Sequence, residues 1–157
     1  ESIHVITQQH INAFSLLYLM SESEKIGSVY ITAWVISERS ISAFLELIDS
    51  GKINQMNLVI AAGMKQLQKN RYDQLVQAIN HRRGKLVISF IDNHTKISAI
   101  KTELNYYVIE GSGNFSNNAK IEQYTISNSK TLYEFHVGWI REICFIQSES
   151  KRHEIIS

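Results

Sequence analysis

Two hydrophobic patterns alternate along the first part of the chain. Apolar residues recur three, four and seven positions apart over 41–48 and 72–79, which predicts amphipathic helices, and the apolar stretch 11–20 predicts another. Ser37 is a suitable N-cap for the helix over 41–48, and Gly51 a suitable C-terminal stop. Nearly continuous apolar runs, typical of buried strands, cover residues 28–36, 57–62 and 85–91. Strand and helix therefore alternate, which predicts parallel strands with helices packed on the sheet.

The pattern changes in the second part of the chain. Residues 95–101 and 103–111 are two predicted strands joined by a short turn, so they are expected to be antiparallel, and 121–127 is another strand. Apolar residues at helical spacing over 132–143 predict a long amphipathic C-terminal helix. We therefore expect one α/β domain over residues 1–157, with a mixed, largely parallel sheet flanked by helices.

Composition narrows the class of protein without naming a function. The 157 residues are 44% hydrophobic and 20% charged, as in ordinary globular domains. The net charge of +1 gives no global field, so any anion binding must be local. A single cysteine excludes an internal disulfide and agrees with a reducing, cytoplasmic location. No apolar run approaches the roughly 20 residues that span a bilayer, so no membrane partner is expected.

One stretch carries candidate chemistry. His94 and Lys96 lie two apart on a predicted strand, so their side chains are expected on the same face. A Gly111-Ser112-Gly113-Asn114 turn follows the end of the next strand. Its glycines allow positive φ and close backbone approach, and Ser112 and Asn114 add hydrogen-bond donors. If the two strands pair, an imidazole, an ammonium and several neutral donors converge, a set that suits a phosphate in a five-coordinate transition state.

The same residues resemble the signature of the phospholipase D superfamily, a His-x-Lys followed by a Gly-Ser-x-Asn turn. The chain is most similar to the small nuclease-type members that carry one motif per chain. The resemblance implies a phospholipase D-like fold and a carboxylate downstream of the Asn that orients the His, for which Glu122 is the match. One position departs from the pattern: Lys101 stands where the family usually has an Asp, which is regarded as structural there.

What the resemblance implies is a metal-independent phosphodiesterase, foremost a nuclease that hydrolyses DNA or RNA through a phosphohistidine intermediate. Because the chain has one motif and family enzymes use two, a homodimer is expected to bring two copies of His94 and Lys96 together. Asn114 and Ser112 are expected to stabilise the phosphoryl oxygens, and Glu122 to hold an imidazole nitrogen. No cofactor or metal is expected. Further phosphate or nucleic-acid contacts are expected at Gly111, Gly113, Ser116, Lys120, Arg82 and Arg83.

Two alternatives remain open at the level of sequence. The chain could be a catalytically weak or inactive nucleic-acid-binding or assembly subunit that keeps the motif as an anion site. It could also be a phospholipase, which ranks last because no exposed basic amphipathic helix is evident. Two further aromatic side chains are given structural roles: Trp34, in the apolar run 28–36, is expected in the core, and His136 is expected to be a core or interface residue.

Overall fold

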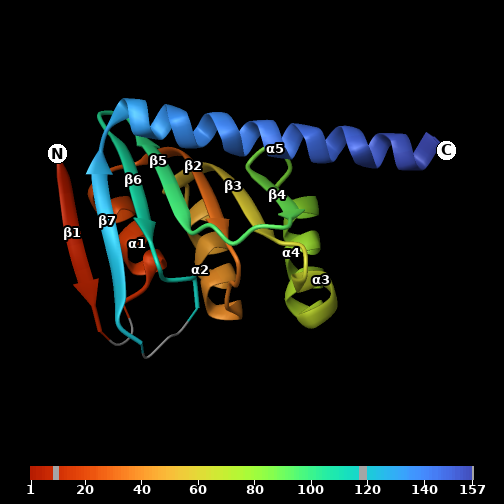
Figure 1. The fold of residues 1–157 in the computed structure, drawn as a ribbon, viewed down its shortest axis with the longest axis horizontal. Helices are drawn as coiled ribbons and strands as arrows, with labels where there is room; N and C mark the ends of the chain where they lie inside the picture. Colours follow the sequence, from red (N-terminus) through yellow and green to blue (C-terminus); the bar gives the residue numbers. More distant parts are fainter. Residues whose placement is uncertain (9–10, 117–119, 157) are drawn as a thin grey trace.

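The computed structural model describes residues 1–8, 11–116 and 120–156, with side chains described up to residue 146. It contains a seven-stranded sheet in the order β1-β7-β6-β5-β2-β3-β4 (Figure 1). The strands are β1 (Ser2–Thr7), β2 (Ile26–Ala33), β3 (Ile53–Ala61), β4 (Leu86–Ile91), β5 (Ile97–Thr102), β6 (Tyr106–Gly111) and β7 (Glu122–Asn128). The helices are α1 (Ala13–Ser23), α2 (Glu38–Asp49), α3 (Met64–Leu67), α4 (Lys69–His81) and α5 (Lys130–Ile156).

Helices cover both faces of the sheet, and each face has its own apolar core. On one face, Leu17 of α1, Phe44 of α2 and Leu75 of α4 pack in a single cluster with buried strand residues. On the other face, α5 lies against β4, β5 and β6. The residues of this second core are Tyr30, Val59, Ala99, Val108, Tyr133, Val137 and Ile140. The mixed α/β architecture expected from the sequence is therefore confirmed.

The sheet is mostly antiparallel, which corrects the expectation of a largely parallel one. Only the β2–β3 and β3–β4 neighbours are parallel. The antiparallel neighbours are β2–β5, β5–β6, β6–β7 and β1–β7. The error has two sources: the chain returns through the consecutive strands β5, β6 and β7, and β1 gives no clear apolar pattern because it is an edge strand whose Ile3 and Ile6 are exposed.

Capping residues fix the ends of α2 as the sequence predicts. The Ser37 hydroxyl accepts a hydrogen bond from the Ser40 backbone N–H at 3.1 Å. Gly51, with φ of 76°, follows the C-cap Ser50 and adopts the left-handed conformation that glycine accepts without strain. Because Ser37 lies only four residues after the end of β2, this cap also fixes where the chain leaves the sheet.

Strand direction brings the motif residues to one edge of the sheet. Strands β2, β4 and β6 end at this edge, and β5 and β7 begin there, at the lower side of Figure 1. We call it the motif edge; it comprises residues 34–37, 92–96, 112–116 and 120–122. Segments far apart in the sequence therefore meet because the strands that carry them alternate in direction. No helix in the described part of the chain is both long and apolar enough to cross a membrane.

Candidate active site

His94 and Lys96 lie in the connection between β4 and β5, not on a strand as expected, because β5 begins at Ile97. The pairing of β5 with β6 nevertheless extends to this point, since the Gly111 N–H donates to the Lys96 carbonyl at 3.4 Å. The predicted pairing of the segment that carries His94 with the strand that enters the glycine turn is confirmed. The positions of the His94 and Lys96 side chains are therefore set by a turn and not by the alternation of side chains along a strand.

That turn is fastened to the end of β2 on both sides of His94. The Thr95 backbone N–H donates to the Asn93 side-chain oxygen at 3.1 Å, as in a turn closed by an Asn side chain. The Asn93 amide donates to the Ala33 carbonyl at 3.3 Å, and the Thr95 hydroxyl donates to the Thr32 hydroxyl at 2.8 Å. His94 itself is exposed, but the residues on either side of it, Asn93 and Thr95, are both hydrogen-bonded to β2.

The His94 imidazole lies against an exposed indole. Its ring centroid is 5.4 Å from that of Trp34, with the planes inclined by 39°. Trp34 follows the last residue of β2 and is 47% exposed, which corrects its assignment to the core. Lys96 is tied to the same connection because its ammonium donates to the His94 carbonyl at 3.0 Å. An imidazole, an ammonium and an aromatic surface thus adjoin one another at the motif edge.

Asn114 connects the turn after β6 to the end of β2. Its side-chain oxygen accepts hydrogen bonds from the backbone N–H groups of Trp34 at 3.2 Å and Val35 at 3.3 Å. The Ser37 N–H donates to the Phe115 carbonyl at 2.8 Å, which joins the two segments a second time. Because the oxygen of the Asn114 amide is engaged, its NH₂ group is the part left to donate to a ligand. Trp34 therefore contacts both residues: its ring lies against His94, and its backbone N–H donates to Asn114.

Ser112 and Glu122 form a separate pair beside this cluster. The Ser112 hydroxyl donates to the Glu122 carboxylate and accepts from the Gln123 backbone N–H at 3.2 Å. Among the described contacts none joins Glu122 to His94 of the same chain. The carboxylate expected to orient the imidazole therefore lies at the motif edge but is held by Ser112.

Gly111 and Gly113 are needed for close packing rather than for a left-handed backbone. The described glycines with positive φ are Gly51 and Gly84, which corrects the expectation for the turn. A Cβ on Gly111 would lie 2.4 Å from the Gln123 carbonyl oxygen, and one on Gly113 would lie 1.9 Å from the Tyr124 hydroxyl. Burial, with the Glu122 charge nearby, raises the pKa of Tyr124 to about 12, so this hydroxyl stays protonated at neutral pH. The close approach is therefore to Gln123 and Tyr124 of β7, within the chain.

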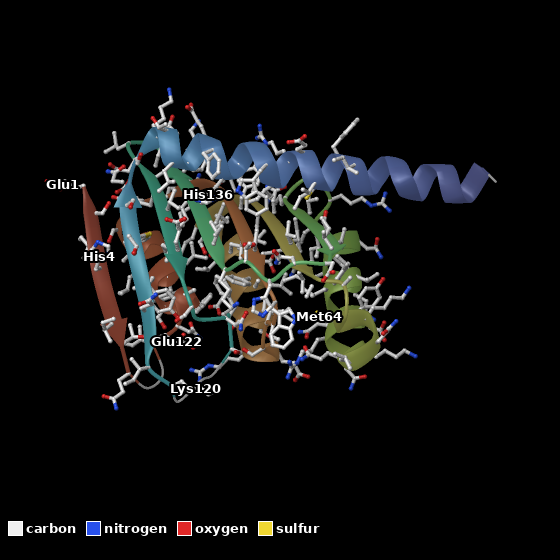
Figure 2. The ribbon with its side chains drawn as sticks, in the orientation of Figure 1. Glu1, His4, Met64, Lys120, Glu122 and His136 are labelled. Atoms are coloured by element: carbon white, nitrogen blue, oxygen red, sulfur yellow. The ribbon has the colours of Figure 1, made fainter. Side chains whose placement is uncertain are left out.

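The remaining expected phosphate contacts divide between the two edges of the sheet. Lys120 is exposed next to the start of β7, at the same end of the molecule as Glu122 (Figure 2). Ser116 is half-buried, and its carbonyl accepts from the Asn12 side chain at 3.4 Å. Arg82 instead precedes β4 at the opposite edge and forms a bidentate pair with Asp49, at 2.8 and 2.5 Å. Arg82 and its neighbour Arg83 are thus separated from the motif edge by the length of β4, so the structure does not bring them together with His94 and Lys96.

The unusual Lys101 lies far from the candidate chemistry, at the other end of β5. It is exposed, and its ammonium lies 5.7 Å from the centroid of the Tyr106 ring. A carboxylate is nevertheless present at the nearby β5–β6 turn. Glu24 accepts hydrogen bonds from the Thr102 hydroxyl, the Asn105 amide at 2.8 Å and the Tyr107 hydroxyl at 2.9 Å. The hairpin that carries the motif is thus fastened by an acidic side chain from the segment before β2.

His136 has the core role expected from the sequence. It is buried on the α5 face, bonded to Glu110 at 3.1 Å, and accepts from the Trp139 indole N–H at 3.0 Å. Figure 2 shows it beside α5, above Glu122. Because a tryptophan N–H can only donate, the bonded nitrogen of His136 carries no proton. This imidazole therefore links Trp139 of α5 to Glu110, the residue just before Gly111 of the turn.

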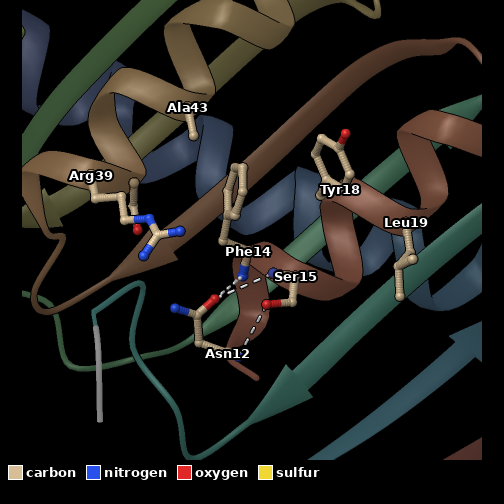
Figure 3. Close-up of a pocket in the computed structure, with 8 residues that line it drawn as sticks. Asn12, Phe14, Ser15, Tyr18, Leu19, Arg39 and Ala43 are labelled. Carbon is tan, nitrogen blue, oxygen red and sulfur yellow. Dashed lines mark hydrogen bonds between the residues drawn. The ribbon is translucent and has the colours of Figure 1, made fainter. Parts of the chain in front are cut away.

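A cavity of about 430 Å³ lies between α1 and α2 (Figure 3). Phe14, Tyr18 and Ala43 form its apolar part, and Arg39 contributes a cation. Asn12, which caps α1 by accepting from the Phe14 and Ser15 N–H groups, also lines it.

In the described residues, no group of three or more His, Cys, Asp or Glu side chains is arranged as metal ligands would be.

The chain is similar in fold to several proteins of known structure. No family model matches the sequence, and no curated protein matches it. NucT from Helicobacter pylori is 13% identical with a TM-score of 0.64, and the match covers 90% of this chain and 95% of NucT. Polyphosphate kinase from Porphyromonas gingivalis is 13% identical with a TM-score of 0.66, over 92% of this chain and 26% of the kinase. Phosphatidylserine synthase from Haemophilus influenzae is 9% identical with a TM-score of 0.63, over 90% and 38%.

These three proteins are members of the phospholipase D superfamily. The chain spans about a quarter of the kinase and less than half of the synthase, but nearly all of NucT. At identities of 9–13% the likeness concerns the fold. The chain therefore has the phospholipase D fold that its His-x-Lys and Gly-Ser-x-Asn residues imply.

Proposed function

We propose that this protein is a metal-independent phosphodiesterase, foremost a nuclease that hydrolyses DNA or RNA. One observation carries the proposal: His94, Lys96 and Asn114, whose NH₂ group donates to no described residue, lie around the end of β2 at the motif edge. This set combines a nucleophile, a fixed positive charge and a neutral donor. Those are the groups that phosphoryl transfer requires when positioning and charge stabilisation do most of the catalysis.

The proposed reaction has two steps. A neutral His94 nitrogen attacks phosphorus, so an N–P bond forms while the bond from phosphorus to the leaving oxygen breaks. A protonated imidazole donates its proton to that oxygen. The same imidazole, now neutral, takes a proton from water as the water attacks phosphorus and releases His94. Imidazole suits every role because both of its protonation states are accessible near neutral pH.

Two imidazoles are needed, and among the described side chains of one chain His94 is the imidazole at the motif edge. The other histidines whose side chains are described lie on β1, at the end of α4 and on the α5 face. We therefore propose a two-fold homodimer that places two copies of His94 and Lys96 around one phosphate. Lys96 and Asn114 would stabilise the phosphoryl oxygens, and Ser112 would position Glu122. Glu122 would hold a ring nitrogen of one imidazole at the shared site.

Nucleic acid is favoured over phospholipid as the substrate. The match to NucT, a nuclease, covers almost the whole of both chains. A catalytically inactive subunit that binds nucleic acid is the alternative, and Lys101 is the position that favours it. Lys101 lies at the far end of β5 and Glu24 supplies a carboxylate to the same hairpin, so the departure does not remove a group from the motif edge.

A cleavage assay in EDTA tests the proposal. Wild-type protein is expected to cut single- or double-stranded DNA or RNA with all divalent cations chelated, whereas His94→Ala and Lys96→Ala are expected to be inactive. His81→Ala is the matched control, because His81 is an exposed histidine at the end of α4, at the opposite edge of the sheet. Salt-dependent binding without products would favour the non-enzymatic alternative. Headgroup release from phospholipid vesicles would favour the lipase.

A further inference from the structure

We propose that Trp34 is a stacking platform for an unpaired base, so that the strand entering the site is single-stranded beside the scissile phosphate. This deepens the proposed function and rests on it, since it names the form of nucleic acid that the same site would take. The large indole of Trp34 is exposed although nearby residues of the same segment are buried.

The exposure of Trp34 contrasts with the residues around it. Ala33 is fully buried and Ile36 is 1% exposed, whereas Trp34 between them is 47% exposed. Tryptophan buries more apolar surface than other residues when it packs, so leaving it open forgoes stabilisation that a core position would give. Because the exposed indole adjoins the imidazole proposed to attack phosphorus, its open face is available to stack against a base of the substrate.

The position of the indole relative to the proposed chemistry is fixed from two sides. Its ring lies 5.4 Å from the His94 ring, and its backbone N–H donates to the Asn114 oxygen at 3.2 Å. A base is joined to its phosphate through one sugar, so a surface adjacent to the attacking imidazole lies within reach of the base beside the scissile phosphate. The ring planes are inclined at 39°, and His94 leaves nearly half of Trp34 open.

Only an unpaired base can use such a surface fully. In a duplex both faces of a base are covered by its neighbours, whereas a single strand can turn a base out onto an aromatic side chain. Stacking is tolerant of sequence and of the sugar, so it applies to DNA and RNA alike. It also compensates for weak electrostatic attraction, because a chain with a net charge of +1 has no strong global field for phosphates.

Binding measurements on a protein that cannot turn over separate this inference from the proposed function. In a His94→Asn background, the Kd for a short single-stranded oligonucleotide is measured by fluorescence anisotropy with and without Trp34→Ala. We expect a rise in Kd of about 5- to 150-fold, the range for loss of one base–aromatic stack. Trp34→Phe is expected to restore most of the affinity, and Phe135→Ala, which removes an exposed aromatic on α5, is expected to change nothing.

A chemically matched ligand tests stacking itself. An oligomer of equal length in which every residue is abasic keeps the phosphates but has no base to stack, so Trp34→Ala is expected to leave its Kd unchanged. An equal loss of affinity for the abasic oligomer would overturn the proposal, because Trp34 would then act only by shaping the site. So would a loss that accompanies a change of oligomeric state, or an equal loss for a duplex that has no unpaired end.

The outcomes for the platform and for the enzyme are distinguishable. Cleavage by wild-type protein together with equal oligonucleotide affinity in the presence and absence of Trp34 would reject the platform and retain the nuclease. Base-dependent affinity that requires Trp34, in a protein that yields no cleavage products, would retain the platform and reject the nuclease. Parallel DNA and RNA oligonucleotides identify which of the two sugars the site accepts.

Discussion

At the scale of single residues, Asn114 has a structural role and a proposed catalytic role, and each belongs to a different atom of its side-chain amide. The oxygen holds the end of β2, and the NH₂ group is proposed to bind a phosphoryl oxygen. Asn114→Asp keeps an acceptor for the Trp34 and Val35 N–H groups but replaces the donor with a negative charge. We expect kcat to fall by about 10²–10³, as for loss of one oxyanion donor, with little change in unfolding free energy. Steady-state kinetics and urea unfolding measure the two effects.

Asn114→Ala is the companion variant and is expected to behave differently. It removes the acceptor as well, leaving two backbone N–H groups at the end of β2 without their partner, so stability falls by about 1–3 kcal/mol together with activity. If Asn114→Asp were fully active, the amide would have no part in binding the phosphoryl group. Equal stability of wild type and Asn114→Ala would contradict the anchoring role.

The sequence predicts motif residues better than it predicts their surroundings. His94, Lys96 and Asn114 are recognised because a resemblance depends on residue type and spacing. Trp34 is assigned to the core because the run from 28 to 36 is nearly continuous in apolar residues, and nothing in that run marks Ala33 as the last strand residue. The polar Ser37 and Glu38 just beyond it are the one signal that the chain is leaving the sheet. Arg82 and Arg83 are not brought to the motif edge, because basic residue type alone does not show which end of β4 a residue occupies.

At the scale of elements, the packing of β6 against β7 depends on Gly111. A Cβ there would meet the backbone oxygen of Gln123, which cannot rotate away. Gly111→Ala is therefore expected to lower the unfolding free energy by about 1–3 kcal/mol, measured by urea denaturation. Gly138→Ala is the control, because its Cβ would meet nothing within 4 Å on α5 and alanine favours helix by about 0.5–1 kcal/mol. Equal effects of the two substitutions would contradict the packing role.

The β5–β6 hairpin depends on the ionised form of Glu24. The hydrogen bond from the Thr102 hydroxyl, with smaller help from Tyr107 and Asn105, lowers the pKa of Glu24 despite partial burial. A lowered pKa in the folded state means that this stabilisation is complete above the unfolded pKa and is lost as the pH falls through the folded one. The stability gap between wild type and Glu24→Gln is therefore expected to be widest near neutral pH and to narrow from about pH 5 towards about pH 3.

Thermal or urea unfolding at several pH values measures that gap. Glu103→Gln is the control, because Glu103 is an exposed carboxylate in the same hairpin. A gap that stays constant across the pH range would show that the hydrogen bonds of Glu24 do not require its charge.

Element prediction succeeds where apolar runs are long and fails where they are short. Strands β2 and β4 and helix α4 lie close to their predicted ranges because their apolar residues form clear patterns, whereas β3 begins four residues before the predicted 57–62. The edge strand β1 and the single-turn helix α3 were not predicted, because neither has enough buried apolar residues to produce a period. The largely parallel sheet was predicted because β1 was missed and the antiparallel pairs formed by β5, β6 and β7 were given too little weight.

At the scale of the whole molecule, the account requires two chains for one site. We expect a species of twice the 18.0 kDa chain mass in sedimentation equilibrium. Specific activity is expected to fall on dilution in step with the fraction of dimer, because the proposed site takes one His94 from each of two chains. Activity that is independent of concentration in a proven monomer would contradict the shared site.

The most direct test of the central claim is to trap the covalent intermediate on His94. Protein turning over a labelled oligonucleotide in EDTA is quenched in alkali, digested with trypsin, and examined by mass spectrometry for the peptide that contains His94. The account predicts a nucleotide-phosphoryl adduct on His94 in the wild type, none in His94→Ala, and an unchanged adduct in His81→Ala. Cleavage that proceeds with no adduct on this peptide at any quench time, or that survives in His94→Ala, would contradict it.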